Sequence, residues 1–339
     1  MIIDLRSDTV TKPTKKMLEA MFNAKVGDDV FNEDPTIIAL EKKVAKLFGK
    51  ESALFCPSGT MTNQIAIKIH TQPGDEVLCD ATAHIYNYEG GGISFNSGVQ
   101  AKLIQGERGR ISAKQIEESI NPTFDWLTKT SLVAIENTAN RAGGSYYSLK
   151  QMQELASVCK KNKLKYHLDG ARIFNAIVEN NYTTKQLGSL FDSISVCLSK
   201  GLGAPAGSVL VGDADFIKQA RRVRKVFGGG MRQAGYIAAA GIYALDNHIQ
   251  RLKEDHKRAK QLAKTMSKLS YIDNILPVDT NILIFNLNNK LSPEKFVKQL
   301  SDKNIKAVGF GKQAIRFVTH LDFTDDMLTK VEKTLKSIK

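Results

Sequence analysis

The chain has 339 residues, of which 42% are hydrophobic and 24% are charged, and its formal net charge is +13. This length and composition fit a globular protein with one large domain and one smaller domain. Asp4, Arg6 and Asp8 interrupt the N-terminus before a signal-peptide core could form, and the longest apolar run, at 236–245, is too short to span a bilayer. We therefore expect neither export nor a membrane anchor.

The cysteine pattern favours a reducing compartment. The four cysteines lie far apart and form no CxxC pair, and three of them fall in apolar runs typical of strands. We therefore expect reduced core residues in a cytoplasmic protein. They are Cys56, Cys79, Cys159 and Cys197.

The positive charge raises the alternative of a nucleic-acid-binding protein. Basic residues cluster at 221–225 in a predicted helix, where a solvated helix face is the simpler interpretation. The other lysines are scattered among acids, without zinc-finger spacing or an aromatic and basic RNA signature. We expect no nucleic-acid partner.

Other catalytic motifs are missing from the sequence. It contains no GxxxxGK[ST] loop, no HExxH and no Cys/His set with metal spacing, so neither P-loop chemistry nor a metal site is predicted. GLGAPAG at 201–207 resembles a dinucleotide fingerprint, but its last glycine comes one residue late. A nicotinamide-dependent dehydrogenase is therefore not predicted.

The opening segment, 3–13, is polar and irregular. Pro13 stands where a helix through Met17 and Met21 would begin. Ser7 and Asp8 fit an ordinary turn pair, and the alternative is that Ser7 offers its hydroxyl or amide to a substrate carboxylate.

The segment 27–36 reads as a loop too polar to bury. Asp34 is placed to cap a helix whose first residue is Pro35 and which ends at Gly49. The apolar residues of this helix lie on one face, so we expect it to pack on a sheet.

A predicted strand at 52–56 leads to a helix opened by Ser58, Gly59 and Thr60. Unpaired N–H groups at a helix start align with the helix dipole, and a glycine there lets an anion approach closely. The turn is either a simple N-cap or a phosphate site, and we favour the phosphate site.

The next strand, 76–80, places His84 just beyond its end. An isolated histidine is most often a surface or satisfied residue. Because ligands bind at the carboxyl edge of a parallel sheet, we expect His84 to stack on a flat cofactor ring.

Strands and helices then alternate, which predicts a mostly parallel sheet in an α/β fold. The expected strands are 101–106, 131–137 and 165–170, and the expected helices between them are 112–120 and 148–162.

Two strand ends carry the central chemistry. Asp169 ends the apolar strand of HLDGAR, and Lys200 follows the apolar strand beginning at Ser193. A lysine at the end of a buried strand either snorkels to solvent or offers its amine to a carbonyl as a Schiff base. With an aspartate about thirty residues upstream, the pair is typical of a pyridoxal-phosphate enzyme, in which the aspartate keeps the pyridine nitrogen protonated. Arg172 is close enough to bind a carboxylate or the ring hydroxyl.

Three glycines at 228–230 precede Arg232. They could form a bare loop, but an arginine on a flexible loop suits a phosphate. We expect Arg232 to reach an active site, either in its own subunit or in a neighbouring one.

A charged helix at 251–268 reads as the bridge to a smaller domain. We expect a large domain at 1–250, with an N-terminal arm at 1–24, and a small domain at 251–339. Arg316 lies in a mid-strand position at 315–320. A buried guanidinium needs an anion, so Arg316 is either half of a structural ion pair or the clamp for a substrate α-carboxylate, which we favour.

These motifs together resemble those of the threonine aldolases, pyridoxal-phosphate enzymes of the aspartate-aminotransferase fold type (fold type I) among the β-eliminating lyases. The resemblance covers nearly the whole chain and keeps the family's order. It rests on LRSDTVTKP, GDDV, EDPT, PSGTM, IENT, HLDGARIFNA, LSKGLGAPAGSVLVG, GGGMRQAG and IRFVTH.

The resemblance implies a lyase that cleaves L-threonine or L-allo-threonine to glycine and acetaldehyde, in a homotetramer built as a dimer of dimers. It implies that Lys200 carries the cofactor, Asp169 holds the pyridine nitrogen and His84 stacks on the ring. Its remaining implications are that Ser58, Gly59, Thr60 and a neighbouring subunit's Arg232 hold the phosphate, and that Ser7, Arg172 and Arg316 hold the substrate carboxylate.

Two positions depart from the family pattern. Ala139 stands where IENTHNR has histidine, and Phe31 stands where the family often has tyrosine. We therefore predict weak discrimination between threonine and allo-threonine. The rival enzyme classes are other pyridoxal-phosphate lyases, racemases and aminotransferases on the same fold.

Overall fold

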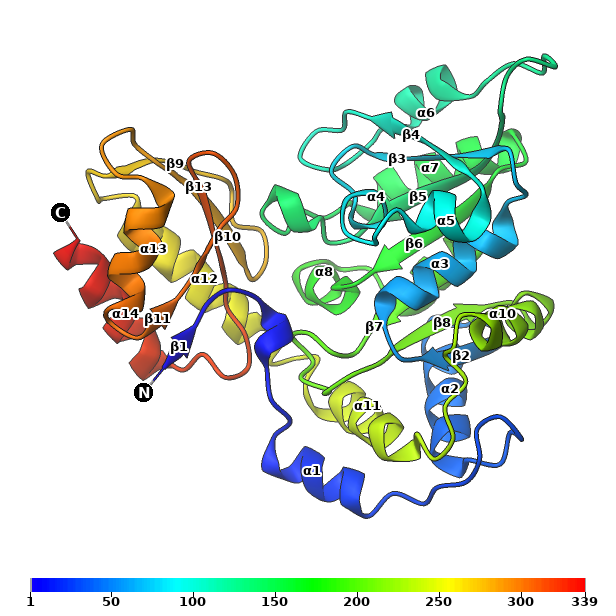
Figure 1. The fold of residues 1–339 in the computed structure, drawn as a ribbon, viewed down its shortest axis with the longest axis horizontal. Coiled ribbons are helices and arrows are strands. Elements are labelled where there is room, and N and C mark those ends of the chain that lie inside the picture. The colour runs from blue at the N-terminus through cyan, green and yellow to red at the C-terminus, as the bar shows by residue number, and fades with distance from the viewer. Residues whose placement is uncertain (1, 339) are drawn as a thin grey trace.

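The computed structural model describes residues 2–338 and separates into a large α/β part and a smaller α+β part (Figure 1). The large part is organised on a seven-stranded sheet of order β2-β8-β7-β6-β5-β3-β4. Its strands are β2 (Ser52–Cys56), β3 (Asp75–Asp80), β4 (Gln100–Ile104), β5 (Lys129–Glu136), β6 (Lys165–Gly170), β7 (Ser193–Cys197) and β8 (Ser208–Gly212).

The helices of the large part lie against this sheet and around its edges (Figure 1). The predicted strands and the helices between them are confirmed, with bounds shifted by a few residues. The helices are α1 (Lys15–Phe22), α2 (Pro35–Phe48), α3 (Gly59–His70), α4 (His84–Asn87), α5 (Gly92–Ser97), α6 (Ala113–Ser119), α7 (Leu149–Lys161), α8 (Ile173–Glu179), α9 (Thr184–Leu190), α10 (Ala214–Val226) and α11 (Gly235–Asn247).

Helix starts follow the capping residues in the sequence. Asp34 accepts hydrogen bonds from the first turn of α2, Pro35 is its first residue, and Gly49 ends it in a left-handed conformation with φ of 64°. The first helix begins at Lys15 rather than at Pro13, because Thr14 caps it. Local capping chemistry therefore fixes these bounds.

The sheet is mostly parallel, as predicted, with β8 as its antiparallel member. The central strands β3, β6 and β7 are buried on both faces at nearly every residue, which is usual for a parallel sheet covered by helices. The connection from β7 to β8 is too short for a crossover helix, so the chain returns antiparallel. Lys200 lies on this short connection.

The smaller part contains a four-stranded antiparallel sheet of order β12-β13-β10-β9. Its strands are β9 (Ile272–Ile275), β10 (Ile282–Leu287), β12 (Val308–Gly309) and β13 (Ala314–Val318), and its helices are α12 (Leu252–Met266), α13 (Pro293–Ser301) and α14 (Asp325–Ser337). The N-terminal strand β1 (Ile3–Asp4) pairs in parallel with β11 (Ile305–Lys306) of this part. Ile3 and Leu5 belong to its hydrophobic core.

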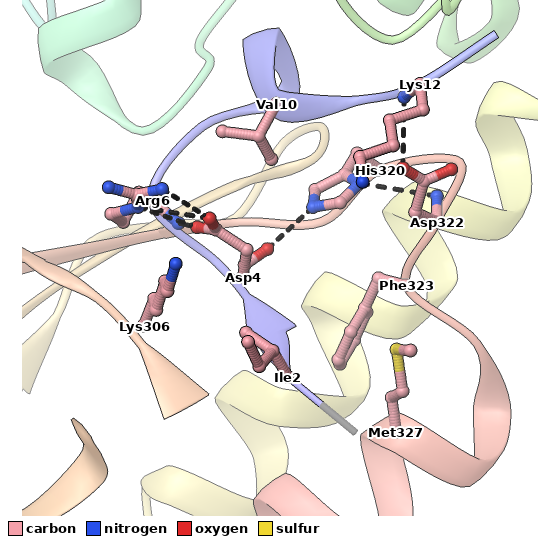
Figure 2. A pocket seen from close by; sticks show the side chains of 10 residues that line it. All are labelled: Ile2, Asp4, Arg6, Val10, Lys12, Lys306, His320, Asp322, Phe323 and Met327. Carbon is pink, nitrogen blue, oxygen red and sulfur yellow. Dashed lines mark hydrogen bonds and ion pairs between the residues drawn. The ribbon is translucent and has the colours of Figure 1, made fainter. Parts of the chain in front are cut away.

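Polar contacts fix the N-terminal segment on the smaller part (Figure 2). The Asp4 carboxylate accepts hydrogen bonds from Nε and Nη2 of Arg6. The backbone carbonyl of Asp4 accepts a 2.6 Å hydrogen bond from His320. The backbone N–H of Lys12 donates to Asp322 at 3.1 Å. The residues between these anchors, which include Ser7 and Asp8, are therefore held at the junction of the two parts.

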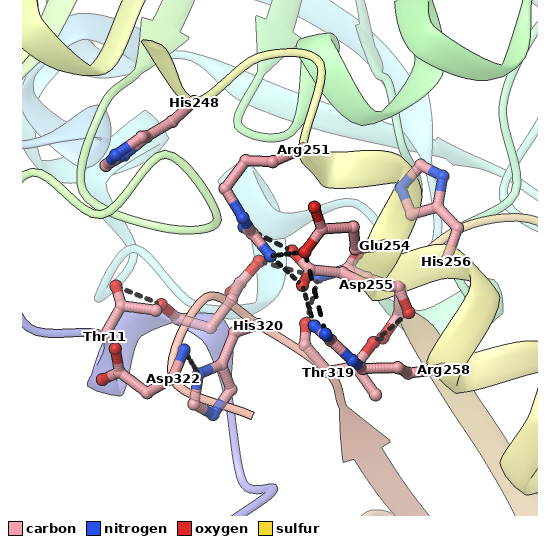
Figure 3. Close-up of polar contacts among 12 residues, drawn as sticks. Thr11, His248, Arg251, Glu254, Asp255, His256, Arg258, Thr319, His320 and Asp322 are labelled. Atoms are coloured by element: carbon pink, nitrogen blue, oxygen red, sulfur yellow. Dashed lines mark hydrogen bonds and ion pairs between the residues drawn. The ribbon is translucent and has the colours of Figure 1, made fainter. Parts of the chain in front are cut away.

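A second set of polar contacts lies at the start of α12 and at the end of α11 (Figure 3). Asp255 is fully buried, and Arg251 donates two hydrogen bonds to its carboxylate. Thr319 donates to the carbonyl of Asp255 at 2.7 Å. His248 shares a 2.7 Å hydrogen bond with the carbonyl of Leu202, so the segment that follows Lys200 is tied to the same junction.

Two expectations about surface polarity are wrong. Asp29, in the segment 27–36, is buried, and so is Arg224 of the basic cluster. Their side chains form a 2.7 Å ion pair, and Arg224 also donates to the carbonyl of Phe55. Burial is tolerated because each charge neutralises the other, which the composition of either segment alone does not reveal.

The remaining expectations about the core hold. The four cysteines are free and buried, as predicted. Within the described residues, we find no helix with the length and apolar character needed to cross a membrane.

Candidate active site

The carboxyl ends of the parallel strands meet at one edge of the large sheet. β6 pairs in parallel with β7, with Asp169 beside Ser195, so Asp169 and the Lys200 connection leave neighbouring strands at this edge. Ser58 follows β2, and His84 follows β3. The topology therefore brings these four predicted site residues to one edge.

Asp169 is buried and paired with donors on both oxygens. Its Oδ1 accepts from the backbone of Ala171 at 3.0 Å, and its Oδ2 accepts from Asn63 at 3.0 Å. Such hydrogen bonds stabilise the charged carboxylate. Atoms of Asp169, His84 and Glu89 lie within 4.8 Å of one another, so the predicted ring partners are close together.

His84 is oriented by Glu89, a buried residue that sequence reasoning missed. Nδ1 of His84 lies 3.1 Å from Glu89. Burial disfavours the charged ring, but the hydrogen bond to Glu89 and the charge of Asp169 outweigh it and raise the pKa of His84 above its usual value. With Nδ1 on the carboxylate, Nε2 is the nitrogen left to face a ligand.

Glu136, at the end of β5, ties His84 to the opposite side of the site. One oxygen accepts from the backbone of His84 and the other from the backbone of Asn140, both at 2.9 Å. Burial, with the charge of Asp169 added, raises the pKa of Glu136 to about 7. Asn140 in turn accepts a 2.8 Å hydrogen bond from Arg316. One buried carboxylate thus positions two predicted ligand contacts.

Lys200 is half-buried on the connection between β7 and β8. Its carbonyl accepts hydrogen bonds from the hydroxyl of Thr11 at 3.0 Å and from the backbone of Gly203 at 2.8 Å. Burial alone would raise the pKa of the Cys197 thiol, but the charge of Lys200 and local hydrogen bonds outweigh it and leave that pKa below its usual value. The charge of Lys200 also helps to lower the pKa of Asp8. The backbone of Lys200 is therefore fixed from the N-terminal segment.

Arg172 binds a carboxylate of the chain itself. Its Nε and Nη2 each donate a 2.7 Å hydrogen bond to Asp8, which is fully buried and also accepts from Asn281. Burial alone would raise the pKa of Asp8, but Arg172 holds it well below its usual range. Sequence reasoning read Asp8 as part of a turn; the structure makes it the anion of a buried bidentate pair.

Arg316 reaches the site from β13 of the smaller part. It donates to Asn140 and to the carbonyl of Arg6, both at 2.8 Å, and its guanidinium lies 4.6 Å from the centre of the Phe310 ring. No carboxylate of residues 2–338 forms an ion pair with it, and its Nε is buried without a hydrogen bond. Burial, and then the charge of Arg172, lower the pKa of Arg316 to about 10. The structural ion pair considered above is therefore not formed among residues 2–338.

The start of α3 presents the predicted phosphate turn. Ser58 caps the helix by accepting from the backbone of Met61 at 3.2 Å, and Gly59 and Thr60 form its first turn. A Cβ added to Gly59 would lie 3.4 Å from the hydroxyl of Ser208. That hydroxyl is buried and has no hydrogen-bond partner within residues 2–338, so it is an unused donor beside the turn.

Arg232 is exposed and contacts residues of the segment 27–36. Its side chain is 54% exposed, donates to Asp28 at 2.9 Å and lies 6.0 Å from the ring centre of Phe31. Phe31 is itself 70% exposed. Within one chain, Arg232 is thus directed toward this exposed surface.

Ser7 and Ala139 complete the predicted set. The Ser7 hydroxyl accepts from the backbone and hydroxyl of Thr9, which leaves its own proton free to be donated. Ala139 is buried, and a Cβ on Gly109 would come within 2.8 Å of the Ala139 Cβ. The turn containing Gly109 therefore fills the space beside position 139.

The residues at this edge fit pyridoxal phosphate. They supply an amine for its carbonyl group, a hydrogen-bonded carboxylate for its ring nitrogen, and a helix start with an unused buried hydroxyl for its phosphate. The unpaired guanidinium of Arg316 fits a substrate carboxylate. Lys200, Asp169 and the α3 turn would hold the cofactor.

Comparisons with known proteins identify the family of this chain. The family model for β-eliminating lyases matches residues 4–290. Low-specificity L-threonine aldolase 1 of Arabidopsis thaliana is 42% identical over 329 residues, covering 95% of this chain and 92% of that protein. The low specificity L-threonine aldolase of Escherichia coli K12 is 40% identical over 341 residues, covering 97% of each.

The same fold occurs in solved structures. A Leishmania major threonine aldolase superposes with a TM-score of 0.85 at 21% identity, covering 98% of each chain. The match to the family model and the identities over almost the whole length lead to one conclusion. The chain belongs to the β-eliminating lyase family.

Proposed function

We propose that this protein is a pyridoxal-phosphate-dependent aldehyde-lyase that cleaves L-threonine, L-allo-threonine and related β-hydroxy-α-amino acids to glycine and an aldehyde. The observation that carries the proposal is the meeting of Lys200, Asp169 and His84 at one sheet edge, beside an arginine without an anion. The names of the full-length relatives support the substrate class.

The cofactor, when bound, supplies an electron-withdrawing ring that stabilises negative charge on the substrate α-carbon. Lys200 would hold it covalently through its amine, at the position that the amino group of the substrate would take. Asp169 would accept a hydrogen bond from the protonated ring nitrogen and so keep the ring positively charged. The start of α3, with Ser58, Gly59 and Thr60, binds the phosphate, as does Arg232 from a neighbouring subunit.

Three residues orient the substrate. Arg316 and Ser7 donate hydrogen bonds to its carboxylate, and Arg172 adds its remaining nitrogen while Asp8 fixes the guanidinium. Holding the carboxylate fixes which bond of the α-carbon stands perpendicular to the ring.

His84 stacks on the ring and acts as the general base. Its Nε2 removes the proton of the β-hydroxyl, directly or through a water molecule, while Glu89 holds Nδ1. Only the neutral ring can accept a proton, and the pKa of His84 is raised. The rate should therefore rise as the pH increases through that pKa.

We further propose a homotetramer in the cytoplasm. Arg232 is exposed and lies beside the exposed Phe31, as a residue serving another subunit's site would be. The four free, buried cysteines favour a reducing compartment.

Product analysis tests the function. Purified protein with pyridoxal phosphate should convert L-threonine to glycine and acetaldehyde, and Lys200→Ala should lose both the turnover and the visible absorption of the bound cofactor. A 2-oxo acid with ammonia, or a requirement for an amine acceptor, would instead establish elimination or transamination. Racemisation at the α-carbon would convert L-threonine to D-allo-threonine. A colourless protein with salt-sensitive binding to nucleic acid would contradict the proposal altogether.

A further inference from the structure

A buried chain of hydrogen bonds leads away from Asp169 through the interior of the large part. Asn63 of α3 donates one N–H to Asp169 at 3.0 Å and the other to Glu89 at 2.9 Å. Its carbonyl oxygen lies 3.1 Å from Nε2 of His167. Nδ1 of His167 lies 2.8 Å from the hydroxyl of Ser193 on β7.

The donor and acceptor groups of these residues allow only one direction of donation along the series of hydrogen bonds. Asn63 has only two N–H groups, and turning its amide over would place the carbonyl oxygen against two carboxylates. The carbonyl must therefore accept from His167, which requires a proton on Nε2. Burial, and then the nearby ring of His70, lower the pKa of His167 to about 3, so the ring is neutral and its Nδ1 accepts from Ser193.

This series of hydrogen bonds ends at His70, the last residue of α3. Its Nε2 lies 2.8 Å from the Ser193 hydroxyl. Since that hydroxyl donates its proton to His167, His70 must donate to it. Asn63, His167 and Ser193 are each at most 2% exposed, so water does not compete for these bonds. The donors from His70 to His167 thus all point toward the Asn63 amide, whose own N–H groups donate to Asp169 and Glu89.

We propose that Asn63, His167 and Ser193 are positioning residues that hold Asp169 ionised and correctly oriented for the ring nitrogen of the cofactor. This inference rests on the proposed function, since it assigns the ring nitrogen to Asp169. A buried donor chain with fixed polarity favours the carboxylate over the carboxylic acid, because a protonated oxygen would face the amide N–H of Asn63.

The alternative is that His167 is a satisfied core histidine with no bearing on the cofactor. A cofactor analogue separates the two possibilities. In 1-deazapyridoxal 5′-phosphate a C–H replaces the ring nitrogen, while the aldehyde that reacts with lysine and the phosphate are unchanged. Its binding does not depend on the charge of Asp169, whereas general damage to the fold weakens both ligands equally.

The experiment measures the dissociation constants of pyridoxal 5′-phosphate and the deaza analogue for the full-length protein. His167→Phe should weaken binding of pyridoxal phosphate about tenfold and Ser193→Ala about threefold, with the analogue changed by less than about twofold. Ser193→Thr keeps a hydroxyl and should restore the affinity. Ser195→Ala is the matched control, since Ser195 is equally buried on β7 but bonds only to Thr62.

Equal weakening of both ligands by Ser193→Ala, or no change in either, overturns the positioning role even if His167→Phe fails to fold. A selective loss equally large in Ser195→Ala also overturns it. Failure of the unaltered protein to bind pyridoxal phosphate contradicts the proposed function itself, and the inference with it.

Discussion

The sheet-edge half of the site, which carries Asp169, and the junction half, which carries Arg316, differ in how their charges are paired. Asp169 receives hydrogen bonds on both oxygens from within the large part. Arg316 donates hydrogen bonds to two uncharged acceptors, and its buried Nε has no hydrogen-bond partner among residues 2–338. The first half is complete before a ligand binds, whereas the second retains an unneutralised positive charge that an anionic ligand would satisfy.

Two arginines make the same contrast within the junction. Arg172 is buried against Asp8, and its loss would leave a fully buried carboxylate without its countercharge. Arg316 forms no ion pair with any carboxylate in the described part of the chain, so its loss removes a desolvated charge and leaves no buried charge unpaired. Stability should therefore depend on Arg172, and substrate binding on Arg316.

The largest expected effect is on folding. Arg172→Gln should lower the free energy of unfolding by about 3–5 kcal/mol, because Asp8 remains buried and unpaired. Urea denaturation followed by circular dichroism measures this loss. A change below about 1 kcal/mol would show that Asp8 finds another partner or leaves the interior.

The next effect separates binding from stability. Arg316→Gln should reduce kcat/KM for L-threonine about a hundredfold, mainly through KM, with little change in the unfolding free energy. Arg6→Gln is the matched control: it also removes a guanidinium, but this one is directed at Asp4, and the carbonyl that contacts Arg316 stays. Equal kinetic losses in both variants would contradict the clamp.

The Asp8 pair also predicts an acid response. The pKa of Asp8 is lowered in the folded protein, so its stabilisation is complete above the unfolded pKa of about 3.9 and is lost as the pH falls toward the folded value. Between pH 4 and 2 the free energy of unfolding of the unaltered protein should fall by about 2–3 kcal/mol more than that of Asp8→Asn. Parallel pH profiles for the two proteins would refute this.

The smallest effect concerns the β-carbon. Position 139 carries alanine packed against the Gly109 turn, and it supplies no hydrogen-bonding group for the substrate hydroxyl. We expect kcat/KM for L-threonine and L-allo-threonine to differ by less than about tenfold. Initial rates measured with the two epimers test this expectation. A preference above about a hundredfold would show that another group binds the substrate hydroxyl.

Much of the sheet-edge half was predictable from sequence because it depends on local order. Asp169 and Lys200 each follow an apolar strand, and parallel strands bring such ends to one edge. The start of α3 at Ser58 and Gly59 was predictable for the same reason, since a helix cap is a local feature.

The partners of these residues were not predictable, because they come from distant segments. Asp8 lies 164 residues from Arg172 in the chain, and nothing around either residue identifies the other. Asn63 and His167 stand inside motifs that drew attention for neighbouring residues, yet their mutual contact depends on how α3 crosses the sheet. Arg224 and Asp29 show the same limit, since each segment alone reads as solvated.

The central claim is that the amine of Lys200 carries the cofactor. Borohydride reduction of the protein with bound pyridoxal phosphate, followed by digestion and mass spectrometry, tests it directly. The account predicts a single phosphopyridoxyl group on the peptide containing Lys200 and none there in Lys200→Ala. Labelling of another lysine instead, or no label on the unaltered protein, would contradict it.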